Sequence, residues 1–276
     1  MPGFDAITDA DHEAFWADGY VIKRGYLTPE EVELARETIR TDPSIAAHVL
    51  ALNDAEGGST DLALWNHPSA DVFGAIARCA RIAGGAERLL GGEVYHYHSK
   101  LTMKRPGGGG RWEWHQDYGY WYQNGCLYPD MLSVAIALDP ATRENGCMQL
   151  LKGSHKLGRI EHGRVAGQTG ADMERVEQAM KTLELVYCEM APGDALFFHS
   201  NTLHCSAANL SPTRRNLLIC CYNKASNNPY KAHHHPFYTP LAKLPDEAVL
   251  AAGVTATERA WMLEGEDATS EGHRAA

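Results

Sequence analysis

The chain has 276 residues, of which 44% are hydrophobic, and its formal net charge at pH 7 is −10. A chain of this length and apolar content can bury one substantial core, so we expect a single domain across residues 1–276. The acidic balance and the lack of a basic run exclude the electrostatic attraction on which nucleic-acid binding depends, so we expect no nucleic-acid partner.

The N-terminal sequence and the cysteines indicate the cellular environment. MPGFDAITDADHEAFW lacks the charged-then-apolar progression of a signal peptide, and no run of about 18 apolar residues occurs, so we expect no membrane association. The seven cysteines are odd in number and include no CxxC pair, which indicates neither a disulfide framework nor a zinc knuckle. We therefore expect a cytoplasmic protein, and its oligomeric state is left open.

Helix signals dominate the first third of the chain. LTPEEVELARETIRTD starts with Thr28 as an N-cap, a proline at the first helical position, and Glu31 in place to complete a capping box. A second helix is expected to start at Ser69 and run through ADVFGAIARCARIAG, and the glycine pair near its end leaves the last residue open. Residues 1–92 are therefore expected to form a helical part.

Strand signals follow from about residue 93 to residue 225. Short segments there alternate in polarity or are rich in β-branched and aromatic residues. The candidates are VYHYHSKLTMKR, RWEWHQD, MLSVAIALD, LELVYCEM, ALFFHS and NLLICCYN. Helices followed by many short strands predict an α+β protein, mostly β, in which N-terminal helices pack on an antiparallel barrel or sandwich.

Two further segments lie outside this pattern. ADMERVEQAMKTLEL has apolar residues at helical spacing between two strand candidates, and we interpret residues 158–185 as an insert, either a lid or an ordinary packed helix. Residues 226–276 are expected to be a C-terminal extension. Its HHHPFY run at 233–238 is interpreted as a loop without assigned chemistry.

The stretch WHQDYGYW contains a candidate metal site. On a strand, residues two apart point to the same face, so His115 and Asp117 should project together, with Trp112 and Trp114 on the other face. An imidazole and a carboxylate on one side supply two ligands of the 2-His-1-carboxylate site of non-haem iron oxygenases. His204, beyond the strand ALFFHS, is the candidate for the third ligand. The alternative for an isolated HxD is a hydrogen-bonded surface pair.

A candidate anion site follows His204 along the chain. Three protein ligands leave metal positions that a 2-oxo acid and dioxygen can fill. Arg215, eleven residues after His204, can neutralise the far carboxylate of such an acid through its planar fork of donors. Ser206 shares the face of His204 and can add a hydroxyl. A pair of solvated arginines is the alternative, and it is the expected state of Arg214.

Two strand candidates are expected to form the walls of this cavity. Small side chains on one face of MLSVAIALD leave room for a ligand. One face of VYHYHSKLTMK is polar and carries His98, Lys100, Thr102 and Lys104. We take Lys100 and Thr102 as candidate contacts to an anionic cosubstrate, although a solvent-facing edge explains this face equally well.

These motifs resemble the phytanoyl-CoA dioxygenase family of Fe(II)- and 2-oxoglutarate-dependent oxygenases, which includes ectoine hydroxylases and natural-product tailoring enzymes. The resemblance starts at DGYVIKRGYLTPEEVELAR, continues through WHQD, DPATRENGCMQLLKGSHKLG and PGDALFFHSNTLHCSAAN, and ends near RRNLLICCYN. It implies a double-stranded β-helix (jelly-roll, cupin-like) core over about 93–225. The implied iron ligands are His115, Asp117 and His204, and the implied 2-oxoglutarate contacts are Arg215 and Ser206.

The resemblance also shows where this chain departs from the family pattern. Lys100 stands where members often have another 2-oxoglutarate contact, commonly a methionine. Ala135 stands where several members have a tryptophan beside the cosubstrate. The retained carboxylate at Asp117 argues against halogenation, since related halogenases have a small residue there.

The implied reaction uses Fe(II), 2-oxoglutarate and O2 to hydroxylate an unactivated C–H bond of a small polar metabolite or natural-product scaffold, releasing succinate and CO2. The aromatic residues Tyr118, Trp121 and Tyr122 are expected at the pocket mouth as a substrate-facing wall, or else as side chains that close the barrel end. Two other classes stay open. One is a β-barrel metalloenzyme without 2-oxoglutarate, such as a zinc hydrolase or cupin-like isomerase, and the other is a non-catalytic binding protein.

Overall fold

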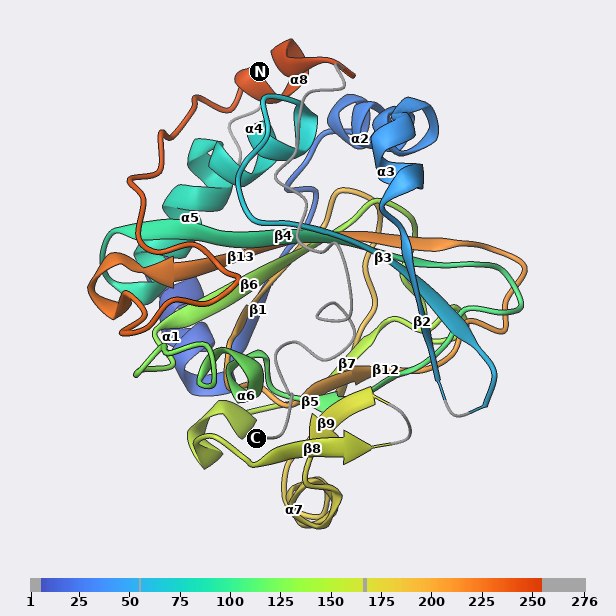
Figure 1. The fold of residues 1–276 in the computed structure, drawn as a ribbon, viewed down its shortest axis with the longest axis vertical. Helices are drawn as coiled ribbons and strands as arrows, with labels where there is room; N and C mark the ends of the chain where they lie inside the picture. Colours follow the sequence, from blue (N-terminus) through green and yellow to red (C-terminus); the bar gives the residue numbers. More distant parts are fainter. Residues whose placement is uncertain (1–5, 55, 166–167, 255–276) are drawn as a thin grey trace.

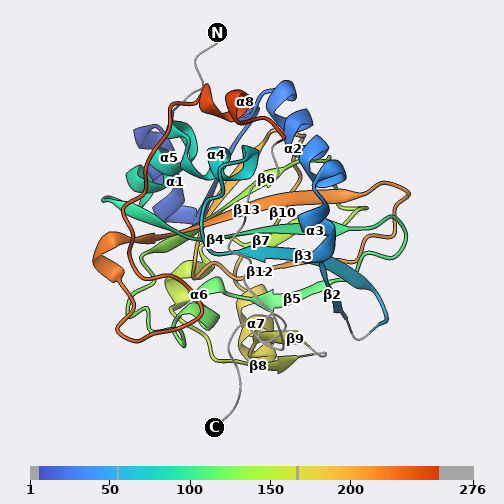
Figure 2. The ribbon, with the colours of Figure 1, turned by 45° about the horizontal axis from the view of Figure 1, so that its top comes forward.

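Two antiparallel sheets face each other, and helices cover the outer side of the larger one (Figures 1 and 2). This computed structural model describes residues 6–54, 56–165 and 168–254. The larger sheet has seven strands and the smaller has four, and a separate two-stranded hairpin lies beside the smaller sheet. The predicted α+β class, with helices packed on a jelly-roll core, is confirmed.

The strands of the larger sheet come from distant parts of the chain. Their order is β1 (Tyr20–Lys23), β11 (Ala195–His199), β6 (Met131–Ala137), β13 (Arg215–Lys224), β4 (Val94–Lys104), β3 (Ser59–Trp65) and β2 (Leu50–Asn53). The order in the smaller sheet is β10 (Leu185–Cys188), β7 (Met148–Leu151), β12 (His204–Ser206) and β5 (Trp112–His115). The separate hairpin pairs β8 (His162–Val165) with β9 (Gln168–Ala171).

The helices lie mostly before β4. They are α1 (Asp9–Asp18), α2 (Pro29–Thr41), α3 (Pro43–Ala47), α4 (Val72–Arg78), α5 (Ala80–Leu90), α6 (Asp117–Trp121), α7 (Met173–Met180) and α8 (Ala248–Ala252). Two short 3-10 helices are η1 (Ser154–Leu157) and η2 (Ala225–Asn227). Among the residues that the structure describes, no helix has the length and apolar content needed to cross a membrane.

All six predicted strands are present, as β4, β5, β6, β10, β11 and β13. The part expected to be helical also contributes β1, β2 and β3 to the larger sheet. The strand conformation of β2, a segment of four residues, depends on its pairing with β3, which in turn pairs with β4. Tertiary pairing of this kind leaves little periodic signal in so short a segment.

The first predicted helix is confirmed in detail. The Thr28 side chain accepts a hydrogen bond from the backbone of Glu31, whose carboxylate accepts one from the Thr28 backbone. The second predicted helix is wrong as a single element, because Cys79 has an extended backbone that separates α4 from α5. The glycine pair lies inside α5, where the small size of Gly85 lets the helix approach Phe197 of β11.

Alternation along β6 separates two cores. Leu132, Val134 and Ile136 pack in the core between the larger sheet and the helices. Ala135 and Ala137 belong to the second core, on the opposite face of the sheet. The small residues therefore face the space between the two sheets, as their spacing predicts.

The insert at 158–185 contains the β8–β9 hairpin and α7. Val176 and Ala179 of α7 are buried in a cluster with Trp114 of β5 and Leu203. This burial favours the packed-helix alternative over the lid.

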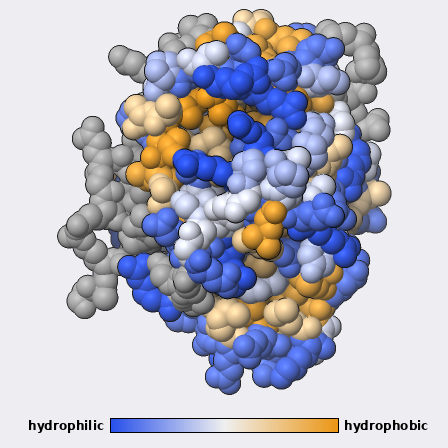
Figure 3. Space-filling view, turned by 90° about the vertical axis from the view of Figure 1, so that its right-hand side faces the viewer, coloured by the Kyte–Doolittle hydropathy of each residue, from blue (hydrophilic) through white to orange (hydrophobic). Residues whose placement is uncertain are grey.

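On the face seen in Figure 3, hydrophilic residues separate apolar groups near the upper and lower ends of the molecule.

A buried ion pair joins two of the covering helices. Arg81 of α5 contacts Glu31 of α2, and both side chains are almost fully buried. We predict that Arg81→Met lowers the free energy of unfolding by about 3 to 5 kcal/mol, because it leaves the Glu31 carboxylate buried without its cation. Urea denaturation measures this change. Arg40→Met, on the exposed side of α2, is the control and should lose little. Equal stability of the Arg81 variant and the wild type would contradict the prediction.

Stability should also depend on two buried histidines away from the candidate metal site. Burial lowers the pKa of His96 and of His199 to about 3, against an ordinary value of 6.5. Between these values the unfolded chain takes up protons that the folded chain does not. We therefore predict that the free energy of unfolding falls as the pH drops below 6.5, by up to about 1.4 kcal/mol per pH unit for each histidine. Urea denaturation between about pH 7 and about pH 5 measures the slope, and a flat profile would contradict it.

Candidate metal and cosubstrate site

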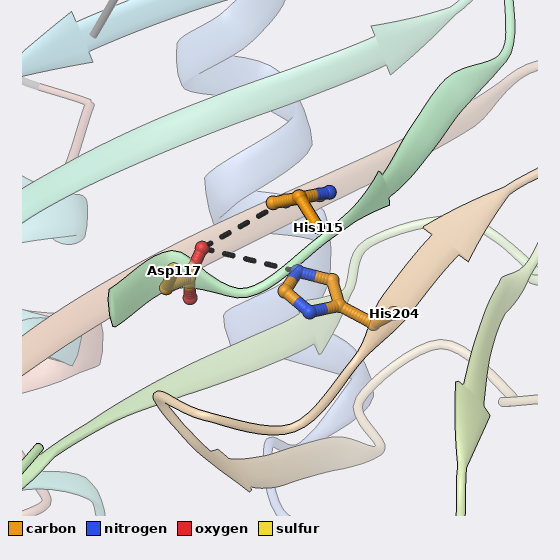
Figure 4. Close-up of side chains that lie close together, drawn as sticks. All are labelled: His115, Asp117 and His204. Atoms are coloured by element: carbon orange, nitrogen blue, oxygen red, sulfur yellow. Dashed lines mark ion pairs between the residues drawn. The ribbon is translucent and has the colours of Figure 1, made fainter. Parts of the chain in front are cut away.

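Three side chains that are distant in sequence meet between the sheets (Figure 4). His204 of β12 pairs directly opposite His115 of β5, and Asp117 is the first residue of α6. Asp117 Oδ1 lies 3.9 Å from His115 Nε2 and 3.8 Å from His204 Nε2. All three residues are buried.

The strand on which Asp117 was expected ends earlier, at His115. Asp117 begins a helix, so the pleat alone does not place it. The intervening Gln116 has an extended backbone, with φ −115° and ψ 134°, and this continues the alternation for one more residue. The two side chains therefore still lie on the same side.

Hydrogen bonds fix which nitrogen of each histidine is free. His115 Nδ1 lies 2.7 Å from the Glu113 carbonyl oxygen, and His204 Nδ1 lies 2.9 Å from that of Thr202. A carbonyl oxygen only accepts, so each Nδ1 carries a proton. Burial lowers the pKa of both imidazoles, partly offset at His204 by Asp117, so each Nε2 presents a lone pair.

The carboxylate is oriented in the same way. The Ser133 hydroxyl of β6 donates a 2.6 Å hydrogen bond to Asp117 Oδ2, which leaves Oδ1 facing the two histidines. Three electron-rich atoms thus converge without a proton between them, and a cation relieves their repulsion. Two imidazole nitrogens and one carboxylate oxygen are the donor set that suits non-haem Fe(II), so these residues fit an iron ion.

A positive site lies further along the larger sheet, on the face that also carries Ser133. Arg215 is 2% exposed, and its Nε has no hydrogen-bond partner among the residues that the structure describes. Burial lowers the pKa of Arg215 to about 10, so the guanidinium keeps its charge at neutral pH. A buried cation of this kind needs an anion to offset its desolvation.

Lys104 of β4 pairs with Arg215 in the sheet register and adds a second basic side chain to this site. Its Nζ donates to Ser206 Oγ at 2.8 Å and to the carbonyl oxygen of Ala207. Burial, and then the charge of Arg215, lower the pKa of Lys104. Because Ser206 accepts from Lys104, its own hydroxyl proton is free to donate to a bound carboxylate. The far carboxylate of a 2-oxo diacid fits this arrangement.

One cavity connects the metal ligands to the positive site. Its lining consists of Lys100, Thr102, Trp112, His115, Met148, His204, Cys205, Ser206, Arg215, Leu217 and Ile219. The predicted cosubstrate residues therefore lie in the same cavity as two of the predicted metal ligands. Thr102 Oγ1 is buried there without a hydrogen-bond partner in the described part of the chain.

Trp112 corrects one expectation from strand alternation. It was placed on the face away from His115, but it lines the cavity, with its ring centroid 6.0 Å from that of His115. The pairing of β5 with β12 shifts register, since His204 lies opposite His115 whereas Ser206 lies opposite Trp112. This irregularity turns Trp112 toward the cavity.

The three aromatic residues after the ligands have different environments. Tyr118 is buried and its hydroxyl donates to the Cys126 carbonyl oxygen, whereas Tyr122 is 43% exposed and stacks on Arg159. Trp121 is buried, edge-on to His98. None of the three belongs to the cavity lining described above, and their role as a substrate wall stays a prediction.

Lys104 was expected only as part of the polar cavity wall, and Ser133 only as one of the small residues of MLSVAIALD, so their specific contacts at the site were not predicted. The signal was present, because Lys104 shares a strand face with Lys100 and Ser133 shares one with Ala135. Their partners, Ser206 and Asp117, come from distant segments. Only tertiary structure shows those contacts.

Comparison with known proteins places the chain in a family. Residues 15–217 match the family described as Phytanoyl-CoA dioxygenase (PhyH). The chain is 33% identical over 207 residues to an L-proline trans-4-hydroxylase of Streptomyces griseoviridis, covering 69% of this chain and 77% of that protein. It is 28% identical over 236 residues to an ectoine dioxygenase of Stutzerimonas stutzeri, covering 78% of this chain and 76% of the relative.

Solved structures share the fold at lower identity. The structure of EctD from S. alaskensis with bound Fe has a TM-score of 0.69 and 22% identity, covering 89% of this chain and 91% of that one. EctD with 2-oxoglutarate and 5-hydroxyectoine has a TM-score of 0.67 and 22% identity, covering 96% and 90%. The epimerase SnoN with Fe3+, alpha ketoglutarate and nogalamycin RO has a TM-score of 0.65 and 21% identity, covering 94% and 96%.

The family match spans most of the chain and agrees with the donor set between the sheets. The protein is therefore a member of the phytanoyl-CoA dioxygenase family, a non-haem iron dioxygenase that uses 2-oxoglutarate.

Proposed function

We propose that His115, Asp117 and His204 hold the iron and that Arg215 and Ser206, with Lys104, bind the far carboxylate of 2-oxoglutarate. The observation that carries this assignment is the convergence of three proton-free ligand atoms, two of them on residues that line the cavity with Arg215. Lys100 and Thr102 line the wall between these two groups and complete the proposed cosubstrate contacts.

When bound, iron and 2-oxoglutarate reduce dioxygen, giving succinate and CO2 and placing one oxygen atom in the substrate C–H bond. The protein's own side chains prepare this chemistry. Hydrogen bonds at Nδ1 hold each ligand imidazole in the tautomer that exposes Nε2. The cation at Arg215 would hold one end of the diacid, so that its oxo-acid end could reach the ligands. The buried walls exclude bulk water.

The names of two relatives support a proposal for the substrate class. By these names, they hydroxylate L-proline or oxidise ectoine, which are small polar ring compounds. We propose a substrate of this kind, a small polar metabolite, hydroxylated at an unactivated C–H bond. A natural-product scaffold remains the second candidate, and it is favoured by the fold shared with the epimerase SnoN.

Arg215 tests where the far carboxylate of 2-oxoglutarate binds. We predict that Arg215→Leu weakens 2-oxoglutarate binding by about 100-fold or more, because loss of a buried charge partner costs roughly 3 to 5 kcal/mol. Anaerobic titration of the Fe(II) protein, followed by its weak visible charge-transfer band, measures the affinity. The exposed neighbour Arg214→Leu is the matched control. Unchanged affinity in the Arg215 variant would show that other residues hold the far carboxylate.

Ser133 should act on iron binding through Asp117. We predict that Ser133→Ala lowers Fe(II) affinity by about 10- to 100-fold, because one carboxylate oxygen loses the hydrogen bond that orients it. Competition with a chelator measures this affinity. Ser200→Ala is the control, since the Ser200 hydroxyl donates to the Pro129 carbonyl oxygen instead. Equal iron affinity in the two variants would show that Asp117 is oriented by other contacts.

A further inference from the structure

His98 on β4 is a buried polar side chain without a hydrogen bond. The residue is 1% exposed, and both of its ring nitrogens have no partner among the described residues. His96, two residues earlier, provides the contrast, because its Nδ1 contacts the Asn66 carbonyl oxygen and its Nε2 contacts Ser99 Oγ. A structural histidine in this strand is thus fully paired, whereas His98 keeps a donor and an acceptor unused at a cost in stability.

The sheet register locates His98 relative to the metal ligands. The pairs between β13 and β4 are Arg215 with Lys104, Leu217 with Thr102, Ile219 with Lys100, and Cys221 with His98. Cys221 also pairs with Ser133 of β6, the residue whose hydroxyl holds Asp117. His98 therefore lies level with the ligand carboxylate, about 20 Å along the strand from Lys104. A five-carbon diacid anchored at Arg215 spans only part of that length.

Rings from two other segments surround His98. Trp121 lies edge-on at 5.7 Å between ring centroids, and it belongs to α6, the helix that Asp117 begins. His235, from the HHHPFY run, stacks on His98 at 4.8 Å. Residues 228–243, which carry His235, contain no helix or strand. Few backbone hydrogen bonds therefore oppose a shift of His235 when a ligand enters.

The charge around this position favours an anion. Lys100, the next residue on the same face of β4, lines the cavity that contains His115 and Arg215. It acts electrostatically on both His98 and His235. A neutral imidazole offers one N–H donor to a carboxylate, and the lysine ammonium supplies the opposite charge. A cationic ligand would be repelled by Lys100.

We propose that His98, supported by Lys100 and flanked by Trp121 and His235, binds a carboxylate group of the primary substrate. This inference rests on the proposed function and adds to it a substrate class, small cyclic carboxylates. The carboxylate of the substrate would lie beside His98, beyond the residues that line the cavity, and the 2-oxoglutarate carboxylate would lie at the Arg215 end of that cavity. The polar face of β4 would then separate the two.

The test uses the anaerobic holoenzyme with Fe(II) and 2-oxoglutarate. L-proline, L-pipecolate and ectoine are the carboxylate probes, and L-prolinamide is the probe without a carboxylate. Shifts of the charge-transfer band report binding. We expect at least one carboxylate to bind and L-prolinamide to bind at least about tenfold more weakly than L-proline or not at all.

Two variants of His98 separate recognition from folding. His98→Phe keeps the ring and its burial but removes both nitrogens, and it should weaken binding of the carboxylate by at least about tenfold. Its Tm should be equal or higher, because an unpaired polar ring is replaced by an apolar one. His98→Gln retains a donor and an acceptor and should keep most of the affinity.

Three results would overturn the subsite. They are a band that no carboxylate probe perturbs, equal binding of L-proline and L-prolinamide, and a His98→Phe variant that binds like the wild type or loses the band itself. Absence of the band from the wild-type protein would instead remove the iron and 2-oxoglutarate assignment. The two failures are therefore distinguishable.

Discussion

The functional centre depends on the mutual repulsion of three unprotonated ligand atoms held close together in a buried space. Backbone carbonyl oxygens accept hydrogen bonds from the Nδ1–H groups of His115 and His204, and a serine hydroxyl donates a hydrogen bond to one oxygen of Asp117. Each hydrogen bond removes an alternative that would let the ligands pair with one another. The folded chain is thus prepared for a metal ion, and β5, β12, α6 and β6 supply the three ligand atoms and the serine that orients one of them.

The other end of the cavity also holds buried charges that repel each other. Arg215 and Lys104 face each other across neighbouring strands, where their charges repel and burial removes the compensation of water. The Ser206 hydroxyl and the Ala207 carbonyl oxygen compensate Lys104 in part. We propose that the dianionic cosubstrate offsets the remaining charge. The small residues of β6 face the space between the sheets, while its large residues pack under the helices.

Local patterns predicted some elements closely and failed where distant contacts decide. The capping residues of α2 lie within four positions of each other, so the start of the helix was readable. The break at Cys79 was not readable, because each half of the segment has good helical residues and the halves differ in their distant contacts: α4 packs on α2 and α8, whereas α5 packs on the larger sheet. Strand β2 was missed for a related reason, since its conformation depends on pairing with β3.

The sequence by itself determined the chemistry available to this protein. HxD, a distant histidine and an arginine eleven residues after it predicted the ligand types, and alternation predicted which of these side chains share a face. Tertiary structure decided which atoms meet. The irregular pairing of β5 turned Trp112 into the cavity, and contacts between distant segments joined Lys104 to Ser206 and Ser133 to Asp117. The physical reason is that periodicity records which face a side chain occupies, whereas its partner depends on the registers of strands that are far apart in the chain.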